Sequence, residues 1–345
     1  MTKETAGMET RAWIWNGSIV PELTSLPLPE LREHDVLVKI RAIGICATDL
    51  HIMKRSAIFA EPPYALGHEA AGEVIKVGGA VTRVRVGDRC TLDPSIGCGS
   101  CNACLSGDKH QCVRNREYGI NQSGFWQEYV VIPENNLYIL PESIGYDEAS
   151  QCETIHVCLG GMDKVQLRGG ERAIIIGDGP TGLFFARLCR LMGASHVTVA
   201  GSRKKRLELA LAYGADEAFS IREKDALSVV EERSFDVVIE AVGKAETIQL
   251  AQKLVANKGR VLLFGLPEHK VEFDVMDLIL REITCIGSAN APRVWPRVIE
   301  LLASERISVA PMITDRFPYE QLDQAIACAF AGGQERIKVI VENNG

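Results

Sequence analysis

The sequence predicts an α/β protein with two domains, a β-rich and partly open barrel and a doubly wound parallel sheet. Between about residues 10 and 155, apolar and polar residues alternate in short segments broken by Gly, Pro and Asp, as in half-buried strands. Between about 170 and 287, short apolar runs alternate with helical patterns, which is typical of βαβ units. A chain of 345 residues is long enough for two such cores.

The expected elements follow in order along the chain. The first domain should contain strands at 36–45, 70–78 and 126–134. The parallel sheet should contain strands at 173–177, 196–201, 236–243, 259–265 and 283–288, with helices at 181–194, 204–215 and 245–256 between them. We expect the tail, with helices at 294–304 and 319–333 and a strand at 337–342, to return to the first domain.

Composition and charge narrow the range of partners. The net charge of −7 favours solubility over attraction to phosphate backbones, so we expect neither nucleic acid nor a membrane surface as a partner. No apolar run approaches the roughly 18 residues that span a bilayer, and the first ten residues are polar rather than signal-like. These features predict a cytoplasmic protein that acts on a small molecule.

Four of the eleven cysteines lie close together, in the pattern C-x2-C-x2-C-x7-C. Cys98, Cys101, Cys104 and Cys112 could close a tetrahedral thiolate site, which suits a structural Zn²⁺ with no open position. An iron–sulfur cluster is the competing interpretation, but the usual ferredoxin spacings are missing. Metal binding in a reducing compartment explains these cysteines better than a disulfide framework.

A second group of metal-ligand residues lies upstream, in G-I-C-A-T-D-L-H and L-G-H-E. Cys46 and His68, with a carboxylate from Glu69 or the later Glu153, would give three protein ligands and one open position, as in catalytic zinc sites. Taken singly, each residue is more simply explained as part of a core. Their combination with the four cysteines and a nucleotide motif favours the catalytic interpretation.

Three residues that follow Cys46 could support this site. Asp49 can accept a hydrogen bond from the second ring N–H of a metal-bound histidine. The Thr48 hydroxyl and the His51 imidazole could pass a proton from an alcohol to solvent, although Thr48 could instead cap the following helix. The catalytic candidates are therefore Cys46, Thr48, His51 and His68.

Residues 173–188 form a buried strand, a G-D-G-P-T-G loop and an amphipathic helix. Gly177 permits a tight turn, Gly179 lets a pyrophosphate approach the backbone, and Gly182 allows the helix to pack closely on the strand. Pro180 and Thr181 lie at the expected helix start. This strand and helix context makes the loop a strong prediction of dinucleotide binding.

The end of the second strand of this unit bears on the choice of cofactor. An acidic residue that would bind the ribose hydroxyls of NAD is expected there, but Gly201 occupies the position. Ser202, Arg203 and Lys204 could instead bind a 2′-phosphate, so we favour NADP(H) over NAD(H). The alternative is a solvated helix start, and Asp178 is an unusual negative charge beside this loop.

With these motifs, the sequence resembles the zinc-containing medium-chain dehydrogenases, in particular the sorbitol and threonine dehydrogenase branch. The resemblance covers residues 36–341 and rests on CATDLH, GHE, VGDRC, the four cysteines, GDGPTG and FGLP. It implies a GroES-like catalytic domain at 1–156 and 291–345 and a Rossmann domain at 157–290. It further implies a homodimer or homotetramer.

The resemblance also assigns residues to roles. Cys46, His68 and Glu69 look like the catalytic zinc ligands of the polyol branch, and Glu153 resembles a carboxylate that contacts zinc directly or through water. Gly265 and Leu266 resemble the segment whose backbone holds the nicotinamide amide. Gly287, Ser288 and Ala289 resemble the stretch that follows it.

Two departures weaken the case for sorbitol itself. Ile52 and Met53 follow His51 where sorbitol dehydrogenases usually carry an aromatic residue, and Asn290 replaces the polyol-binding Arg. Candidate lining aromatics are Phe59, Tyr118, Trp126 and Trp295, although such residues are more often core. The leading hypothesis is hydride transfer between NAD(P) and a secondary alcohol of a polyol or cyclitol. The alternatives are a threonine-type amino-alcohol dehydrogenase and a catalytically silent relative.

Overall fold

The computed structural model describes residues 7–56 and 59–345, and the chain divides into two compact units. Unit 1 comprises Met1–Glu153, Trp295–Gly332 and Lys338–Gly345, and unit 2 comprises Thr154–Val294 and Gly333–Ile337. Compared with the domain limits expected from the sequence, residues 154–156 and 291–294 fall in unit 2, and so does the segment Gly333–Ile337. It packs in unit 2 because Lys205 pairs with Glu335 at 2.8 Å and the Arg206 guanidinium donates to the carbonyl of Arg336.

Unit 1 is built mainly from antiparallel strands. Its largest sheet has the order β10-β6-β5-β3-β18-β17 with β9 also paired to β3, a second sheet has the order β2-β1-β4, and β7 pairs with β8. The strands are β1 (Glu9–Trp15), β2 (Glu22–Pro27), β3 (Asp35–Ile45), β4 (Tyr64–Ala65), β5 (Glu69–Val77), β6 (Arg89–Leu92), β7 (Ser95–Ile96), β8 (Arg116–Glu117), β9 (Tyr129–Pro133), β10 (Leu137–Ile139), β17 (Ile313–Pro318) and β18 (Lys338–Glu342). The helices are α1 (Ala47–Met53), α2 (Asn102–Leu105), α3 (Tyr146–Ala149), α10 (Trp295–Ala303) and α11 (Leu322–Ala331).

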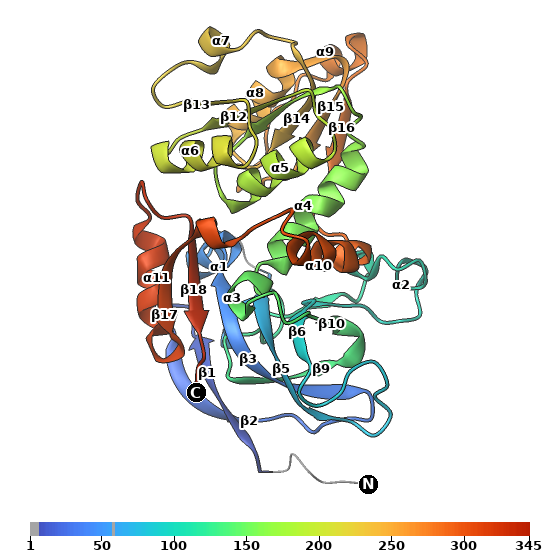
Figure 1. Ribbon diagram of the computed structural model, residues 1–345, viewed down its shortest axis with the longest axis vertical. Coiled ribbons are helices and arrows are strands. Elements are labelled where there is room, and N and C mark those ends of the chain that lie inside the picture. Colours follow the sequence, from blue (N-terminus) through green and yellow to red (C-terminus); the bar gives the residue numbers. More distant parts are fainter. Residues whose placement is uncertain (1–6, 57–58) are drawn as a thin grey trace. The chain divides into compact units, whose positions relative to one another are not determined.

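The chain's tail returns to the first strands of unit 1, as the sequence predicts. β18 pairs antiparallel with β3, where Ile340 lies opposite Gly44, and Figure 1 shows the red β18 beside the blue β3. The structure adds β17, which pairs parallel with β18 and was not predicted. Its sequence ITDRFP lacks a regular alternation, and only its first residue is buried.

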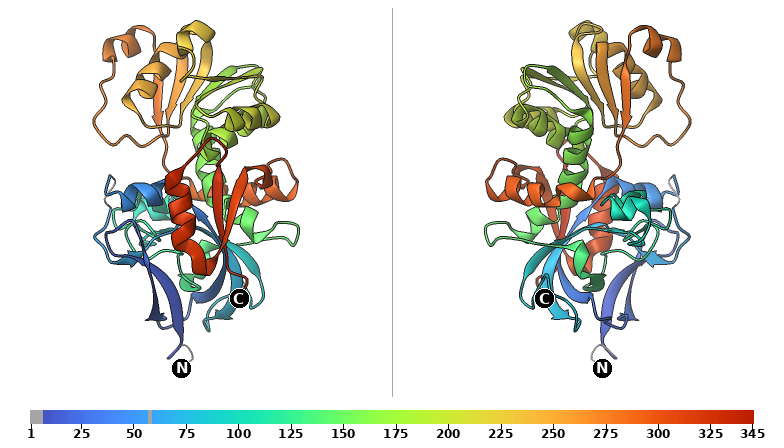
Figure 2. Two further views of the ribbon diagram at one scale, coloured as in Figure 1. Left: turned by 90° about the vertical axis from the view of Figure 1, so that its left-hand side faces the viewer. Right: turned by 90° about the vertical axis from the view of Figure 1, so that its right-hand side faces the viewer.

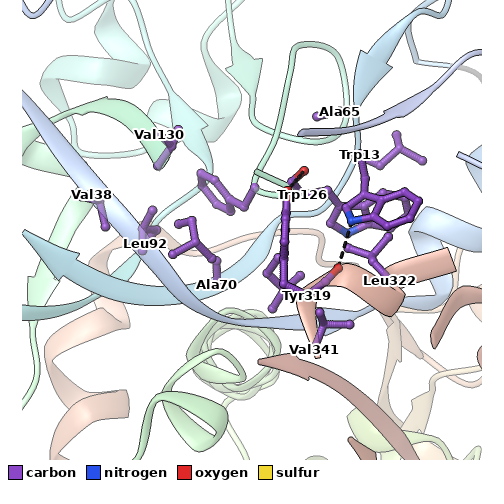
Figure 3. Close-up of a cluster of buried hydrophobic side chains, with 14 of the residues drawn as sticks. Trp13, Val38, Ala65, Ala70, Leu92, Trp126, Val130, Tyr319, Leu322 and Val341 are labelled. Carbon is purple, nitrogen blue, oxygen red and sulfur yellow. Dashed lines mark hydrogen bonds between the residues drawn. The ribbon is translucent and has the colours of Figure 1, made fainter. Parts of the chain in front are cut away.

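The hydrophobic core of unit 1 contains side chains from both early and late segments of the chain (Figure 3). The Trp13 indole of β1 donates to the backbone carbonyl of Tyr319 at 3.0 Å, and both side chains belong to one buried cluster. Trp126 is fully buried in the same cluster, and Trp295 is also fully buried and stacks on Tyr138 at 5.1 Å. The core interpretation of these two tryptophans is therefore the correct one.

Unit 2 contains a six-stranded parallel sheet with the order β13-β12-β11-β14-β15-β16, and helices cover both of its faces (Figure 2). The strands are β11 (Arg172–Ile176), β12 (His196–Gly201), β13 (Glu217–Ser220), β14 (Phe235–Glu240), β15 (Val255–Leu263) and β16 (Thr284–Gly287). The helices are α4 (Cys152–Val165), α5 (Pro180–Leu191), α6 (Lys204–Ala212), α7 (Ala226–Val229), α8 (Ala245–Leu254) and α9 (Val275–Leu280).

The strand order reverses between β11 and β14, and in doubly wound sheets nucleotides bind at such a switch point. The predicted fold class, a GroES-like β-rich domain with a Rossmann domain, is confirmed. Within the described part of the chain, none of the helices is both long enough and apolar enough to span a bilayer.

Candidate metal centre and dinucleotide site

The pairing of β3 with β5 brings the first metal-ligand group together. Gly44 lies opposite Glu69 in this antiparallel ladder, so Cys46 just after β3 and His68 just before β5 are also neighbours. The ligand atoms of Cys46, His68 and Glu69 all lie within 4.8 Å of one another. In a tetrahedral zinc site with bonds of about 2.0–2.3 Å, ligand atoms lie roughly 3.3–3.8 Å apart, so small side-chain shifts would let the set hold a zinc ion.

Asp49 orients two members of this group. It is fully buried, its Oδ2 accepts from the backbone amide of Cys46 at 2.9 Å, and its Oδ1 lies 3.3 Å from Nδ1 of His68. This is the position expected for a carboxylate behind a ligating histidine. The amide contact also closes a capping box at Cys46, so α1 begins at Ala47 and Thr48 is not its cap. The capping alternative for Thr48 is therefore wrong.

Glu69 is held by a buried cation that the sequence motifs did not reveal. The ammonium of Lys338 on β18 forms an ion pair with Oε2 of Glu69, and both residues are at least 96% buried. Nε2 of Gln151 donates to the same oxygen at 3.0 Å. A Cβ at Gly44 would overlap Oε2 of Glu69 and Nε2 of Gln151, so any other residue there would displace this cluster.

The charges around this group reinforce one another. Burial opposes the charged form of His68, but the neighbouring Asp49 and Cys46 raise its pKa well above the usual value. Burial likewise opposes the charge of Lys338, whose pKa is nevertheless raised by Glu69 and Cys46. A cation that binds His68 must displace a proton, which makes metal binding weaken as the pH falls.

Glu153, the alternative carboxylate, is buried next to this group without belonging to it. Burial raises the pKa of Glu153 to about 8, with His68 opposing and Glu69 adding to the shift. A carboxyl group with this pKa is largely protonated at neutral pH, whereas Glu69 forms an ion pair with Lys338.

Thr48 and His51, the candidate residues for a proton relay, both lie on α1. His51 is exposed, and its Nδ1 lies 3.1 Å from the hydroxyl of Ser56, whereas Thr48 is half-buried. Phe59 is 48% exposed, and Tyr118 stacks on Phe125 at 5.1 Å. An exposed imidazole one turn from a hydroxyl can exchange protons with water.

The four cysteines converge in a separate lobe of unit 1. The sulfurs of Cys98, Cys101, Cys104 and Cys112 also lie within 4.8 Å of one another. Backbone donors favour the thiolate at two of these residues: hydrogen bonds from Ser100 lower the pKa of Cys98 to about 5, and the amide of Cys98 lowers that of Cys112. Burial raises the pKa of Cys104 to about 11. Four sulfurs at this separation suit one tetrahedral metal ion.

The glycine-rich loop of unit 2 has the shape that phosphate binding requires. Gly177 has φ of +125°, which favours glycine, and a Cβ at Gly182 would overlap the carbonyl of Gly177. A Cβ at Gly179 would meet nothing within 4 Å, so the backbone there is open to a ligand. Gly179 caps α5, whose first residues are Pro180 and Thr181, and the free N–H groups of such a helix start attract phosphate.

At the end of β12, the structure reveals a contact that sequence reasoning missed. Asp178 is only 6% exposed, and its Oδ2 accepts from the backbone amides of both Ser202 and Arg203 at 2.7 Å. Lys204 is exposed and lies 4.0 Å from Glu208 on α6. The sequence showed a carboxylate near the loop, but not that it points at residues 202–203.

The predicted nicotinamide segment is formed by two closely packed loops. A Cβ at Gly265 would overlap the amide of Gly243, and the amide of Gly265 donates to the carbonyl of Glu240 at 3.0 Å. Leu266 is 68% exposed, and the Ser288 hydroxyl lies 3.0 Å from the ammonium of Lys164. Sequence reasoning also missed the Glu240 carboxylate, which is buried and accepts from the amide of Gly243 at 2.9 Å.

A nucleotide-type parallel sheet and a β-rich unit with one open and one closed metal-ligand group together define a metal-dependent, nucleotide-linked oxidoreductase. The comparisons agree with this class. Residues 32–142 match the alcohol dehydrogenase GroES-like domain, and residues 180–304 match the zinc-binding dehydrogenase domain. The chain belongs to the zinc-dependent alcohol dehydrogenase family.

Relatives cover almost the whole chain. L-threonine 3-dehydrogenase of Bacillus licheniformis is 34% identical over 87% of this chain and 89% of its own length. Sorbitol dehydrogenase of Bacillus subtilis is 30% identical over 99% of both chains. A structure from Sinorhizobium meliloti, solved bound to NADP, has a TM-score of 0.91 and 31% identity, and the match covers 97% of this chain and 99% of that one.

Proposed function

We propose that the chain transfers a hydride between NADP(H) and a secondary alcohol carbon of a polyol, cyclitol or similar small hydroxylated compound. The observation that carries this proposal is the buried group of Cys46, His68 and Glu69 backed by Asp49. Its sulfur, nitrogen and oxygen donors match a catalytic zinc site with an open fourth position.

A zinc ion bound there would act as a Lewis acid on the substrate oxygen. The protein's own side chains supply the rest. Asp49 holds Cys46 and His68 in place, and Lys338 forms a buried ion pair with Glu69. Thr48 would accept the alcohol's hydrogen bond, and the exposed His51 would exchange the released proton with water. We assign Glu69 as the third zinc ligand. Glu153 would lie next to the zinc site without being a ligand.

The four-cysteine lobe would hold a second zinc ion with a structural role. Cys98, Cys101, Cys104 and Cys112 offer four sulfurs and no open position. The pKa values of Cys98 and Cys112 are lowered by backbone donors, which supports thiolate ligation.

We propose that the cofactor binds along the carboxyl edge of the parallel sheet. The pyrophosphate would lie on Gly177, Gly179, Pro180, Thr181 and Gly182. The nicotinamide would contact Gly265, Leu266 and Ser288. Gly201, Ser202, Arg203 and Lys204 would surround a 2′-phosphate, and the NADP bound by the Sinorhizobium meliloti relative supports NADP(H) over NAD(H). Replacing Arg203 by Ala should raise the NADP(H) Michaelis constant about tenfold to a hundredfold through loss of a charge-assisted contact.

The second candidate substrate class is an amino alcohol, which the threonine dehydrogenase relative favours. For sorbitol itself, the amide oxygen of Asn290 is already engaged by Nε2 of His156 at 2.8 Å, which limits the hydrogen bonds left for a polyol.

A substrate screen tests these proposals. Zinc-loaded protein is assayed with polyols, cyclitols, amino alcohols and simple secondary alcohols, each with NAD⁺ and NADP⁺. The highest kcat/KM should occur with a polyol or cyclitol and NADP⁺. A highest value with threonine would establish the second candidate. No turnover of any alcohol, with zinc and cofactor bound, would support a silent relative.

We also propose a homodimer or homotetramer in a cytoplasmic setting. β16 is an edge strand of its sheet, and α9 just before it exposes Val275, Met276, Ile279 and Leu280 by 59–76%. An open edge beside exposed apolar side chains suits pairing with a second copy across a twofold axis. None of the cysteines in the described part of the chain forms a disulfide, which supports a reducing compartment.

A further inference from the structure

The site proposed for the 2′-phosphate already contains an anion that belongs to the protein. The amides of Ser202 and Arg203, which follow directly after β12, both donate to Oδ2 of Asp178 at 2.7 Å. Adjacent amides that converge on one point form an anion-binding concavity. The carboxylate occupies the donors that a phosphate oxygen would use.

Gly201 and Asp178 form a matched pair. A Cβ at Gly201 would lie 2.6 Å from Cβ and 2.9 Å from Cγ of Asp178, so no side chain fits at 201 while Asp178 stays in place. The acidic residue that NAD-binding sheets carry at the end of this strand is therefore excluded. A carboxylate instead enters the same place from the glycine-rich loop.

The charges around Asp178 bear on the choice between NAD(H) and NADP(H). Arg203 and Asp178 both act electrostatically on Arg206, so the three charges share one neighbourhood. The Arg206 guanidinium is itself tied to the carbonyl of Arg336. A 2′-phosphate carries a charge of about −1.5 to −2 at pH 7 and would be attracted by the arginines but repelled by Asp178.

We propose that Asp178 is a cofactor-selectivity residue, an internal anion that takes the Ser202 and Arg203 amides and so limits the preference for 2′-phosphorylated cofactor. The inference rests on the proposed function in taking this corner as the ribose site. It adds that the cofactor preference depends on two opposing effects. Arg203 attracts a 2′-phosphate, and Asp178 repels it.

The test is calorimetric binding of adenosine 2′,5′-bisphosphate and of 5′-AMP to the full-length, zinc-loaded protein. Asp178→Asn keeps an oxygen that can accept from both amides but removes the charge. We expect it to tighten binding of the bisphosphate at least about fivefold, to leave 5′-AMP within about twofold, and to lose most of this gain at 0.5 M salt. Glu232→Gln is the matched control, because it removes an exposed charge just before β14, at the amino ends of the parallel strands, whereas Asp178 lies at their carboxyl ends, and it should change neither affinity.

A change of the same size in both affinities, no change in either, or a loss for 5′-AMP alone would overturn the inference. Asp178→Ala provides a second variant if the asparagine protein melts at a lower temperature. Wild-type protein that binds 5′-AMP more tightly than the bisphosphate would overturn the proposed NADP(H) preference. The inference itself would still be supported by a shifted ratio in Asp178→Asn. Failure of the wild type to bind either nucleotide would overturn both.

Discussion

The ion pair between Lys338 and Glu69 shows how much the candidate metal centre depends on single side chains. Both residues are buried, and the carboxylate also accepts from Gln151. Removing one partner of a buried pair leaves an uncompensated charge, which costs far more than an exposed pair contributes.

We therefore predict that Lys338→Met lowers the free energy of unfolding by about 3–5 kcal/mol, because Glu69 loses its buried counter-charge. Denaturant unfolding measures the change. Lys224→Met, at an exposed position, is the control and should stay within about 0.5 kcal/mol of wild type. A Lys338→Met protein as stable as the control would contradict the predicted contribution of this ion pair.

Cys46 provides the residue-scale test of catalysis. Cys46→Ser should reduce kcat/KM to background, because a serine hydroxyl is a poor zinc ligand, while calorimetric cofactor binding should be retained. His68→Ala should behave in the same way. Cys285→Ser, at an exposed cysteine of β16, is the control and should keep full activity. Near-normal turnover in Cys46→Ser would mean that the catalytic zinc assignment is wrong.

At the scale of elements, the four-cysteine lobe has little regular structure of its own. It contains the four-residue α2 and the two-residue β7 and β8. Such short elements bury little apolar surface, so a metal ion is the natural source of their stability.

Metal analysis of Cys101→Ser should accordingly give about one zinc per chain instead of about two, with faster proteolysis of residues 95–117. Cys90→Ser, on the nearby β6, should retain both ions. Iron in the wild-type protein, or no loss of metal from Cys101→Ser, would contradict the structural zinc site.

Glu134 fixes the loop before β6. Backbone amides of Thr82 and Arg83 and the imidazole of His34 lower its pKa. Because the folded pKa is depressed, Glu134 stabilises the fold above its unfolded value of about 4.3, and this contribution is lost as the pH falls through the lower folded pKa.

Glu134→Gln should therefore lower the free energy of unfolding by about 1.5–3 kcal/mol at pH 7, and the difference from wild type should shrink below about pH 4. Unfolding curves at pH 7, 5 and 3.5 measure it, with Glu33→Gln at an exposed position as control. A difference that does not vary with pH would mean that charge is not its cause.

At the scale of the whole molecule, β16 and α9 leave an open sheet edge beside exposed apolar residues. The double variant Ile279→Asp with Leu280→Asp should convert the assembly to monomers, because four buried charges at a twofold contact would repel. Light scattering after size exclusion measures the mass, and Val86→Asp, at a 60% exposed position in unit 1, is the control. A wild-type protein that is already monomeric would contradict the proposed contact.

The fold class could be predicted from the sequence, as could the glycine-rich loop, the four-cysteine group and a Cys46–His68 group with a carboxylate from Glu69 or Glu153. These features depend on local spacing: strand alternation, a loop between a strand and a helix, and cysteines with two or seven residues between them. The sequence also placed the tail on the first domain, although it missed β17, whose polar sequence has no strand periodicity.

The tertiary structure was needed to show which buried charged and polar groups contact one another. Lys338 lies 269 positions after Glu69, and the two are neighbours only because β18 pairs with β3 and β3 with β5. Asp178 lies beside Ser202 because β11 and β12 are adjacent parallel strands with their carboxyl ends at one edge. Electrostatic interactions follow distance in space rather than in sequence, so these buried partners could not be read from the chain.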